Sequence, residues 1–259
     1  MATHSLYETW VDELPISIYP TNEALGAAAA EAAAEIIQRV VEQKGEANLI
    51  VATGNSQLTF LAALRQTRTI PWPQVNIFHM DEYVGLAPKH PASFPQFLRR
   101  QLLDYISPKA FYPVPGGASS AKAACQEYET LLRAYPADLC ALGFGENGHL
   151  AFNDPPYANF CDPVWVKVVR LAEASRQQQV GEGHFARVDE VPTQAMTLTI
   201  PALLAAKRIL AIVPEGRKAE AVRRALQGPV HTDCPASILR GMPHAHLFLD
   251  VNSAALIYP

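Results

Sequence analysis

The sequence is poor in charge, and this scarcity narrows the classes of function. Of its 259 residues 18% are charged, and the formal net charge is -4. Proteins that bind nucleic acid or anionic membranes usually carry runs of Lys and Arg, and this sequence has none. We therefore expect neither a nucleic-acid partner nor a membrane partner, and any anionic ligand has to be bound by a small local set of donors.

Long apolar runs and paired cysteines are also missing. No run is long enough to span a bilayer, and residues 1–5 lack the charged and apolar regions of a secretory signal, so the cytoplasm is the predicted location. The cysteines are far apart and show no CxxC spacing. We expect them to be reduced structural thiols: Cys125, Cys140, Cys161 and Cys234.

Strand and helix patterns alternate along the chain. Short apolar runs or strand patterns lie at 48–52, 75–80, 137–142, 166–171, 196–200, 208–213 and 246–250, and helical patterns at 21–46, 93–103, 118–134 and 217–226. Continuous apolar strands are typical of parallel sheets covered on both faces. The sequence predicts one α/β domain over residues 1–259, with a Rossmann-like, mostly parallel sheet and helices on both faces.

A glycine-rich stretch at 141–155 begins in one of these strands and carries several polar side chains close together: Glu146, Asn147, His149 and Asp154. Imidazole titrates near neutrality, and a carboxylate beside it can fix its tautomer, so His149 is a candidate for general acid/base catalysis. The alternative is a glycine loop with one solvated histidine.

A polar turn follows the strand at 48–52, and a helix pattern starts directly after it. The turn consists of Thr53, Gly54, Asn55 and Ser56. The free N–H groups at a helix N-terminus beside such a turn form a natural cradle for a phosphate. The alternative is an ordinary helix N-cap, a position that the same residue types favour.

Two acidic residues follow the next strand. Asp81 and Glu82 would share a crevice with Thr53 and His149 if these strands are neighbours, because ligands of open α/β sheets bind at the carboxyl ends of the strands. The alternative is a cap for the next helix.

The polar segment 173–191 interrupts the alternation. It carries Gly181 and Gly183 and the run Arg176-Gln177-Gln178-Gln179. Long connections in compact domains are often functional, so an active-site lid is expected here, with a solvated surface excursion as the alternative.

Several of these blocks together resemble the glucosamine-6-phosphate deaminase family of sugar-phosphate isomerase/deaminases, whose relatives include 6-phosphogluconolactonases. The resemblance is nearly full length and rests on residues 53–56, 80–86, 143–155, 198–200 and 216–219. It implies a Rossmann-like domain that converts glucosamine 6-phosphate and water into fructose 6-phosphate and ammonia through an enol-type intermediate. No metal and no organic cofactor is implied.

The resemblance also implies roles for matching residues. Lys218 and the 53–56 turn would hold the phosphate, with Glu82 and Gly148 also among the residues expected at the substrate. Asp81 would be the base that moves a proton between C2 and C1 of the opened sugar. His149 would open the pyranose ring.

The chain departs from the family pattern at three places. Asn147 stands where deaminases usually have Asp, and Asp154 stands where they usually have Glu. The family's substrate-binding arginine in the lid falls at or near His184, which leaves Arg176 as the alternative lid cation. We hypothesise that Asp154, rather than Glu146 or Asn147, supplies the charge that supports His149.

Three other functions are compatible with parts of the pattern. A metal site could gather His79, Asp81, His149 and Asp154, but these residues lack ligand spacing, and no metal is expected. Lactone hydrolysis at the same cleft and a weakly catalytic sugar-phosphate sensor are the others, although no helix-turn-helix pattern supports a sensor. The sequence leaves the oligomeric state open, a homo-oligomer included.

Overall fold

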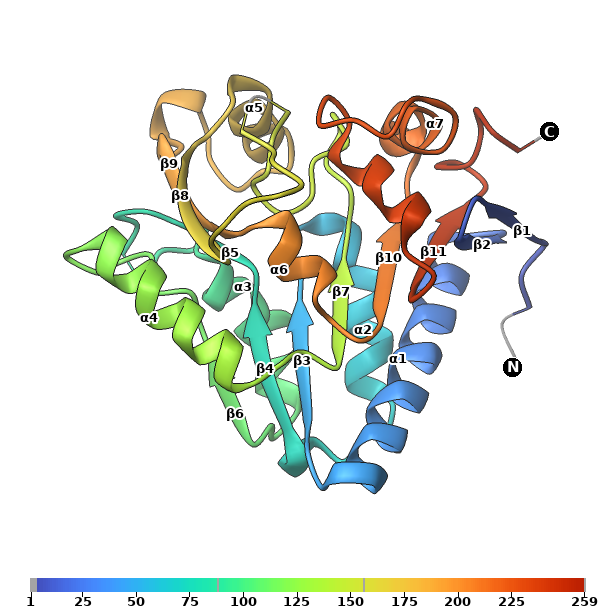
Figure 1. Ribbon diagram of the computed structural model, residues 1–259, viewed down its shortest axis with the longest axis horizontal. Helices are drawn as coiled ribbons and strands as arrows, with labels where there is room; N and C mark the ends of the chain where they lie inside the picture. Colours follow the sequence, from blue (N-terminus) through green and yellow to red (C-terminus); the bar gives the residue numbers. More distant parts are fainter. Residues whose placement is uncertain (1–3, 88, 156, 259) are drawn as a thin grey trace.

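An eight-stranded sheet runs through the molecule in the computed structural model, which describes residues 4–87, 89–155 and 157–258 (Figure 1). Residues 1–3, part of the chain start considered above, lie outside the described residues. The strand order is β1-β2-β11-β10-β7-β3-β4-β6. The strands are β1 Tyr7–Val11, β2 Leu14–Tyr19, β3 Ala47–Val51, β4 Val75–His79, β6 Ala110–Tyr112, β7 Leu139–Leu142, β10 Ile209–Val213 and β11 Ala245–Asp250.

Every neighbouring pair in this sheet is parallel except β1 with β2. The central strands β3, β7 and β10 are buried along their whole length, as their continuous apolar runs require when both faces are covered. The predicted mostly parallel α/β fold is therefore confirmed. The β1–β2 hairpin, which extends one edge, was not anticipated.

Helices cover both faces of the sheet: α1 Asn22–Lys44, α2 Leu58–Gln66, α3 Phe94–Gln101, α4 Ala121–Ala134, α6 Ile200–Leu204 and α7 Ala219–Gln227. The remaining helix, α5 Glu173–Gly181, lies beyond the carboxyl ends of the main strands (Figure 1). Successive side chains of a strand point to opposite faces. Accordingly Leu49 and Val51 belong to a core that includes α1 and α2, whereas Ile50 belongs to a core that includes α4 and α6. The helices thus form the two outer layers, as predicted.

A second, three-stranded antiparallel sheet lies beyond the carboxyl ends of the main strands, next to α5 (Figure 1). It consists of β5 Asp81–Tyr83, β8 Val166–Arg170 and β9 Gln194–Leu198, in the order β5-β9-β8. The strand patterns at 166–171 and 196–200 therefore form strands, but in this small sheet. Their partly exposed residues distinguish them from the fully buried central strands.

No helix among the described residues is long and apolar enough to cross a membrane.

Candidate active site

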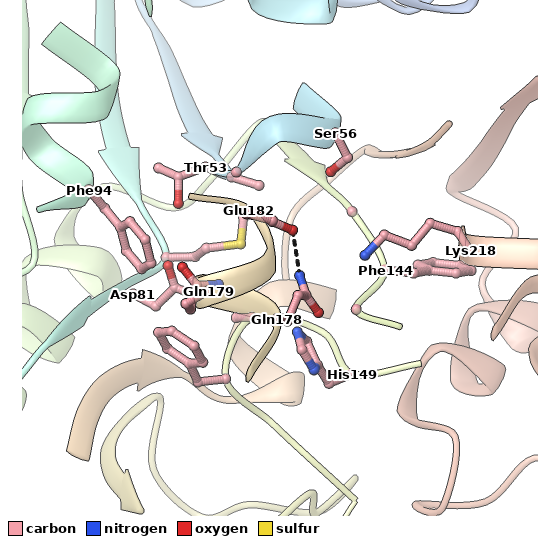
Figure 2. Close-up of a pocket in the computed structure, with 17 residues that line it drawn as sticks. Thr53, Ser56, Asp81, Phe94, Phe144, His149, Gln178, Gln179, Glu182 and Lys218 are labelled. Carbon is pink, nitrogen blue, oxygen red and sulfur yellow. Dashed lines mark hydrogen bonds between the residues drawn. The ribbon is translucent and has the colours of Figure 1, made fainter. Parts of the chain in front are cut away.

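A pocket lies at the carboxyl ends of β3, β4, β7 and β10, with α5 contributing to its lining (Figure 2). The predicted site residues that line it are Thr53, Gly54, Ser56, Asp81, His149 and Lys218. The other predicted site residues are not part of its lining: Asn55, Glu82, Glu146, Asn147, Gly148, Asp154, Arg176 and His184.

The turn after β3 opens its backbone towards the pocket. Gly54 has φ of +103°, and the short helix η1 Asn55–Gln57 begins directly after it. In the described chain no side chain caps η1 or α2, so capping does not explain the polar turn. Asn55 instead donates from Nδ2 to the carbonyl of Glu182, at 3.1 Å, and so ties the turn to the end of α5.

Lys218 ends the short helix η5 Gly216–Lys218 after β10, and 1% of the residue is exposed. Burial, together with the neighbouring charge of Arg217, lowers the pKa of Lys218 to about 8. Among the residues that the structure describes, its ammonium has no hydrogen-bond or ion-pair partner. A buried cation that faces a pocket and has no direct ion pair is suited to an anionic ligand.

Asp81 is the first residue of β5 and is buried in the pocket wall. Burial, reinforced by the charge of Glu82, raises the pKa of Asp81 to about 8. A carboxyl group with a pKa near the working pH can both accept and return a proton, which a group that shuttles a proton between two carbons must do.

Glu82 takes a different role from its neighbour. Its carboxylate accepts hydrogen bonds from the backbone N–H groups of Tyr83, at 2.7 Å, and Phe94, at 3.1 Å. Phe94 is the first residue of α3, so Glu82 caps that helix. The expectation that Glu82 contacts the substrate does not fit this orientation, because successive strand residues such as Asp81 and Glu82 point to opposite sides.

The loop after β7 brings His149 into the pocket. A Cβ added to Gly145 would lie 2.2 Å from the imidazole Cε1, so only glycine permits this approach. Gly148, with φ of +86°, shapes the turn, and its carbonyl accepts from the N–H of Ala236 at 2.8 Å. Gly148 therefore serves the backbone of the loop rather than the lining of the pocket.

Asp154, five residues further along this loop, contacts the imidazole of His149. The two residues are 3.0 Å apart between Oδ1 and Nδ1, and Oδ1 also accepts from Ser175 at 2.6 Å and from Asn147 at 2.9 Å. Burial alone would raise the pKa of Asp154, but hydrogen bonds from His149, Ser175 and Asn147 lower it to about 2. A buried, ionised carboxylate thus lies beside the imidazole.

The two competing neighbours of His149 do not contact its ring. Asn147 donates to Asp154 and accepts from the backbone N–H of His149 at 3.0 Å, so the expected bond to the ring is replaced by these two. Glu146 points outward and forms an ion pair with Arg217 at 3.1 Å. The contacts favour Asp154 as the support of His149.

The segment 173–191 begins with α5, which covers the pocket. Gln178, Gln179 and Glu182 line the pocket, and Gln179 also accepts from the hydroxyl of Tyr83 at 2.8 Å. Sequence reasoning missed these residues and Ser175, because side chains on a polar helix give no signal of the direction in which they point. Arg217 was also missed, although it lies inside the block 216–219.

The two predicted lid cations turn away from the pocket. The Arg176 guanidinium donates to the carbonyls of Val188 and Val191, and it pairs with Glu173 at 3.2 Å. His184 lies 3.4 Å from a Glu182 oxygen and packs its edge against Phe97. In this conformation neither residue lines the pocket.

Comparison with known proteins agrees with this architecture. The family model for glucosamine-6-phosphate isomerases/6-phosphogluconolactonase matches residues 20–247. Glucosamine-6-phosphate deaminases of Bacillus cereus (strain ATCC 14579) and Bacillus cytotoxicus are each 36% identical over 227 and 229 residues, covering 88% of this chain and 84% of theirs.

Solved structures give the same result. A monomeric glucosamine-6-phosphate deaminase superimposes with a TM-score of 0.86 at 31% identity, over 93% of this chain and 99% of that protein. A 6-phosphogluconolactonase from Trypanosoma brucei shares the fold, with a TM-score of 0.76 at 20% identity over 97% and 100% of the two chains. With a family match over most of its length and relatives above 30% identity, the chain belongs to the family of glucosamine-6-phosphate isomerases and 6-phosphogluconolactonases.

Proposed function

We propose that this protein converts glucosamine 6-phosphate and water into fructose 6-phosphate and ammonia. The observation that carries the proposal is the position of two proton-transfer groups, Asp81 and His149, in the same pocket as Lys218, a buried cation without a partner among the described residues. The 36% identity to proteins named glucosamine-6-phosphate deaminases supports this reaction over lactone hydrolysis.

The substrate would bind with its phosphate at the Thr53–Ser56 turn and Lys218. The turn at Gly54 offers backbone N–H groups and hydroxyls, and Lys218 offers a full charge. Charge and donors together offset a phosphate dianion in a protein whose net charge is negative.

His149 would open the ring by moving a proton between the anomeric hydroxyl and the ring oxygen. Asp154 stabilises the imidazolium formed in this step and fixes the ring tautomer, because its carboxylate remains ionised 3.0 Å from Nδ1. Asn147 and Ser175 hold that carboxylate in place.

Asp81 would then take the proton from C2 and return it to C1. Removal of the C2 proton gives an enol-type intermediate with nitrogen on C2, and protonation at C1 leaves an imine at C2. Water adds to that imine, the C–N bond breaks, and ammonia leaves with the ketose phosphate. Burial of the carboxylate strengthens it as a base once it is ionised.

An ammonia-release assay tests the proposal. Purified protein is given glucosamine 6-phosphate, its amino-sugar phosphate epimers and unphosphorylated glucosamine, with 6-phosphogluconolactone hydrolysis as the control reaction. We expect ammonia and fructose 6-phosphate in equal amounts from glucosamine 6-phosphate. Lactone hydrolysis without ammonia release from any amino-sugar phosphate would contradict the assignment.

A further inference from the structure

The pocket contains an anion supplied by the protein itself. The carboxylate of Glu182, at the end of α5, is 5% exposed and lines the pocket beside the Thr53–Ser56 turn (Figure 2). One of its oxygens would lie 3.8 Å from a Cβ added to Gly54. The lid therefore places a negative charge directly over the turn proposed to bind phosphate.

Two hydrogen-bond donors and one imidazole lie around this carboxylate. Arg217 donates at 2.8 Å, Gln178 donates at 2.8 Å, and His184 lies at 3.4 Å. Burial alone would raise the pKa of Glu182, but contacts with His184, Arg217 and Gln178 lower it to about 2. The group is ionised at any working pH, and its surroundings have the form of an anion site.

Arg217 has more negative partners than its charge requires. It forms ion pairs with Glu146 at 3.1 Å, Glu182 at 2.8 Å and Glu215 at 2.5 Å. If Glu182 leaves, two carboxylates still neutralise the guanidinium. The next residue, Lys218, is the buried cation without a partner in the described part of the chain, so Glu182 is the removable anion of this cluster.

We propose that Arg217 is a phosphate ligand, and that Glu182 occupies the position of the substrate's phosphate until the substrate displaces it. The proposal rests on the proposed function, which supplies a phosphorylated substrate. A phosphate dianion carries more charge than a carboxylate and has three terminal oxygens, so it can engage both Arg217 and Lys218. Because the phosphate has to replace the Glu182 carboxylate, only a sugar with a terminal phosphate would bind tightly.

The backbone around Glu182 permits this exchange. A Cβ on either neighbour, Gly181 or Gly183, would have no atom within 4 Å, and Gly183 has φ of +80°. Ser175 and Gln179, which hold the earlier turns of α5, bond to Asp154 and Tyr83 and not to Glu182. The end of α5 can therefore move outward, with loss of the hydrogen bond from Asn55 to the Glu182 carbonyl, while its start remains bound above His149.

Two charge-removing variants test the proposal: Glu182→Gln and Arg217→Gln. Calorimetric titration with fructose 6-phosphate measures phosphate affinity directly. Losing a competing charge or a charge-assisted hydrogen bond changes affinity by about 10–100-fold. We therefore expect Glu182→Gln to bind more tightly, with a lower Kd of roughly that size, and Arg217→Gln to bind more weakly by a similar factor.

Matched controls separate these effects from general changes in charge. Glu173→Gln removes an exposed carboxylate from the same helix, and Arg223→Gln removes an exposed guanidinium on α7. Both should leave the Kd unchanged. Titration with unphosphorylated fructose should give no difference among the variants, because the exchange requires the phosphate.

Two outcomes would overturn the inference. Weaker binding of glucosamine 6-phosphate to Glu182→Gln, with unchanged fructose 6-phosphate affinity, would make Glu182 a partner of the substrate's ammonium group. An unchanged Kd in Arg217→Gln would remove Arg217 from the phosphate site. If no variant releases ammonia while the Kd values shift as expected, the proposed reaction fails and the phosphate exchange stands.

Discussion

Asp81 and Asp154 lie in the same cleft, but their surroundings move their pKa values in opposite directions. Asp81 has a raised pKa of about 8 because it is buried beside Glu82. Asp154 is also buried, but bonds from His149, Ser175 and Asn147 hold its pKa near 2. Two carboxyl groups with separated pKa values suit two roles, a base that exchanges a proton and a permanent charge that supports a histidine.

The raised pKa of Asp81 predicts the acidic limb of the pH profile. The base must be ionised, so kcat/KM should fall by about tenfold per pH unit below pH 8. The measurement is kcat/KM for glucosamine 6-phosphate from pH 5 to pH 9. A plateau of kcat/KM that extends down to pH 5 would contradict the raised pKa. Asp81→Asn should be inactive, and exchange of the C2 hydrogen with deuterated solvent in this variant would show that Asp81 is not the base.

The same shift has a consequence for stability. The pKa of Asp81 is higher in the folded than in the unfolded state, so its protonated form stabilises the fold below pH 4, and that stabilisation is lost as pH rises towards 8. Asn cannot ionise. Asp81→Asn should therefore be more stable than the parent at pH 8, by on the order of 1–3 kcal/mol, and the difference should disappear near pH 4. Urea denaturation at both pH values measures it.

The lowered pKa of Lys218 predicts the alkaline limb of the pH profile. Burial and the charge of Arg217 lower its pKa to about 8, so its charge is lost, and KM should rise, above that pH. Lys218→Ala should raise KM by about 10–100-fold at pH 7 and remove this limb. Lys207→Ala, which removes an exposed lysine, is the control. Unchanged calorimetric affinity in Lys218→Ala would place the phosphate elsewhere.

Asp154 should be the residue whose charge stabilises the protonated form of His149. Asp154→Asn should lower kcat by about 10²–10⁴-fold, the range for losing acid/base assistance. Asn147→Ala should cost less, since Asn147 acts through Asp154 and the backbone. Glu146→Gln is the discriminating variant. The measurement is the pH dependence of kcat for each variant. If Glu146→Gln lowers the part of the pH–rate profile that depends on His149, while Asp154→Asn leaves that part unchanged, the support comes from Glu146.

At the scale of elements, the turns could be predicted from sequence better than their side-chain directions. Glycines at 54 and 148 do adopt positive φ, as a sequence rich in polar turn residues indicates. Two adjacent acids, however, cannot both face one pocket from a strand. Only the pairing of β5 with β9 decides that Asp81 faces the pocket and Glu82 caps α3.

This cap has a measurable consequence. Both Glu82 oxygens accept backbone N–H groups, and Gln offers only one accepting oxygen. Burial raises the pKa of Glu82 to about 7, so the comparison is made at pH 6, where loss of charge contributes little. Glu82→Gln should then lower the free energy of unfolding by about 1–2 kcal/mol, because one buried N–H group loses its acceptor. KM for glucosamine 6-phosphate should not change. Thermal unfolding and steady-state kinetics measure the two effects, and a raised KM with unchanged stability would return Glu82 to the substrate site.

The segment 173–191 shows the limit of prediction from sequence patterns at this scale. Composition predicted a polar excursion at 173–191 but could not assign its contacts. The directions of three side chains on this segment depend on residues that are distant in sequence. Ser175 bonds to Asp154 in the loop after β7, Gln179 bonds to Tyr83 in the small sheet, and Glu182 faces the pocket. Arg176, the more conspicuous residue, bonds within its own segment.

At the scale of the molecule, the main sheet was the most predictable feature. Fully apolar strands such as β7 and β10 are stable only when both of their faces are buried. The small sheet and the β1–β2 hairpin were not predictable in the same way. Partly exposed strands such as β8 fit an edge, a hairpin or a second sheet equally well, and only three-dimensional packing chooses among them.

The order of strands in the sheet also bears on folding kinetics. The pocket is lined by residues between Ala52 and Lys218 in the sequence. The parallel pairs β3–β7 and β7–β10 that bring them together join distant parts of the chain. Non-local parallel pairing is slow, and the loops at its carboxyl ends order only once the pairs have formed. A sugar phosphate should therefore leave the refolding rate unchanged and slow unfolding in proportion to its occupancy, which stopped-flow fluorescence can measure. Nascent or partly unfolded chains would then have no affinity for substrate, and metabolite supply could protect the finished enzyme without assisting its formation.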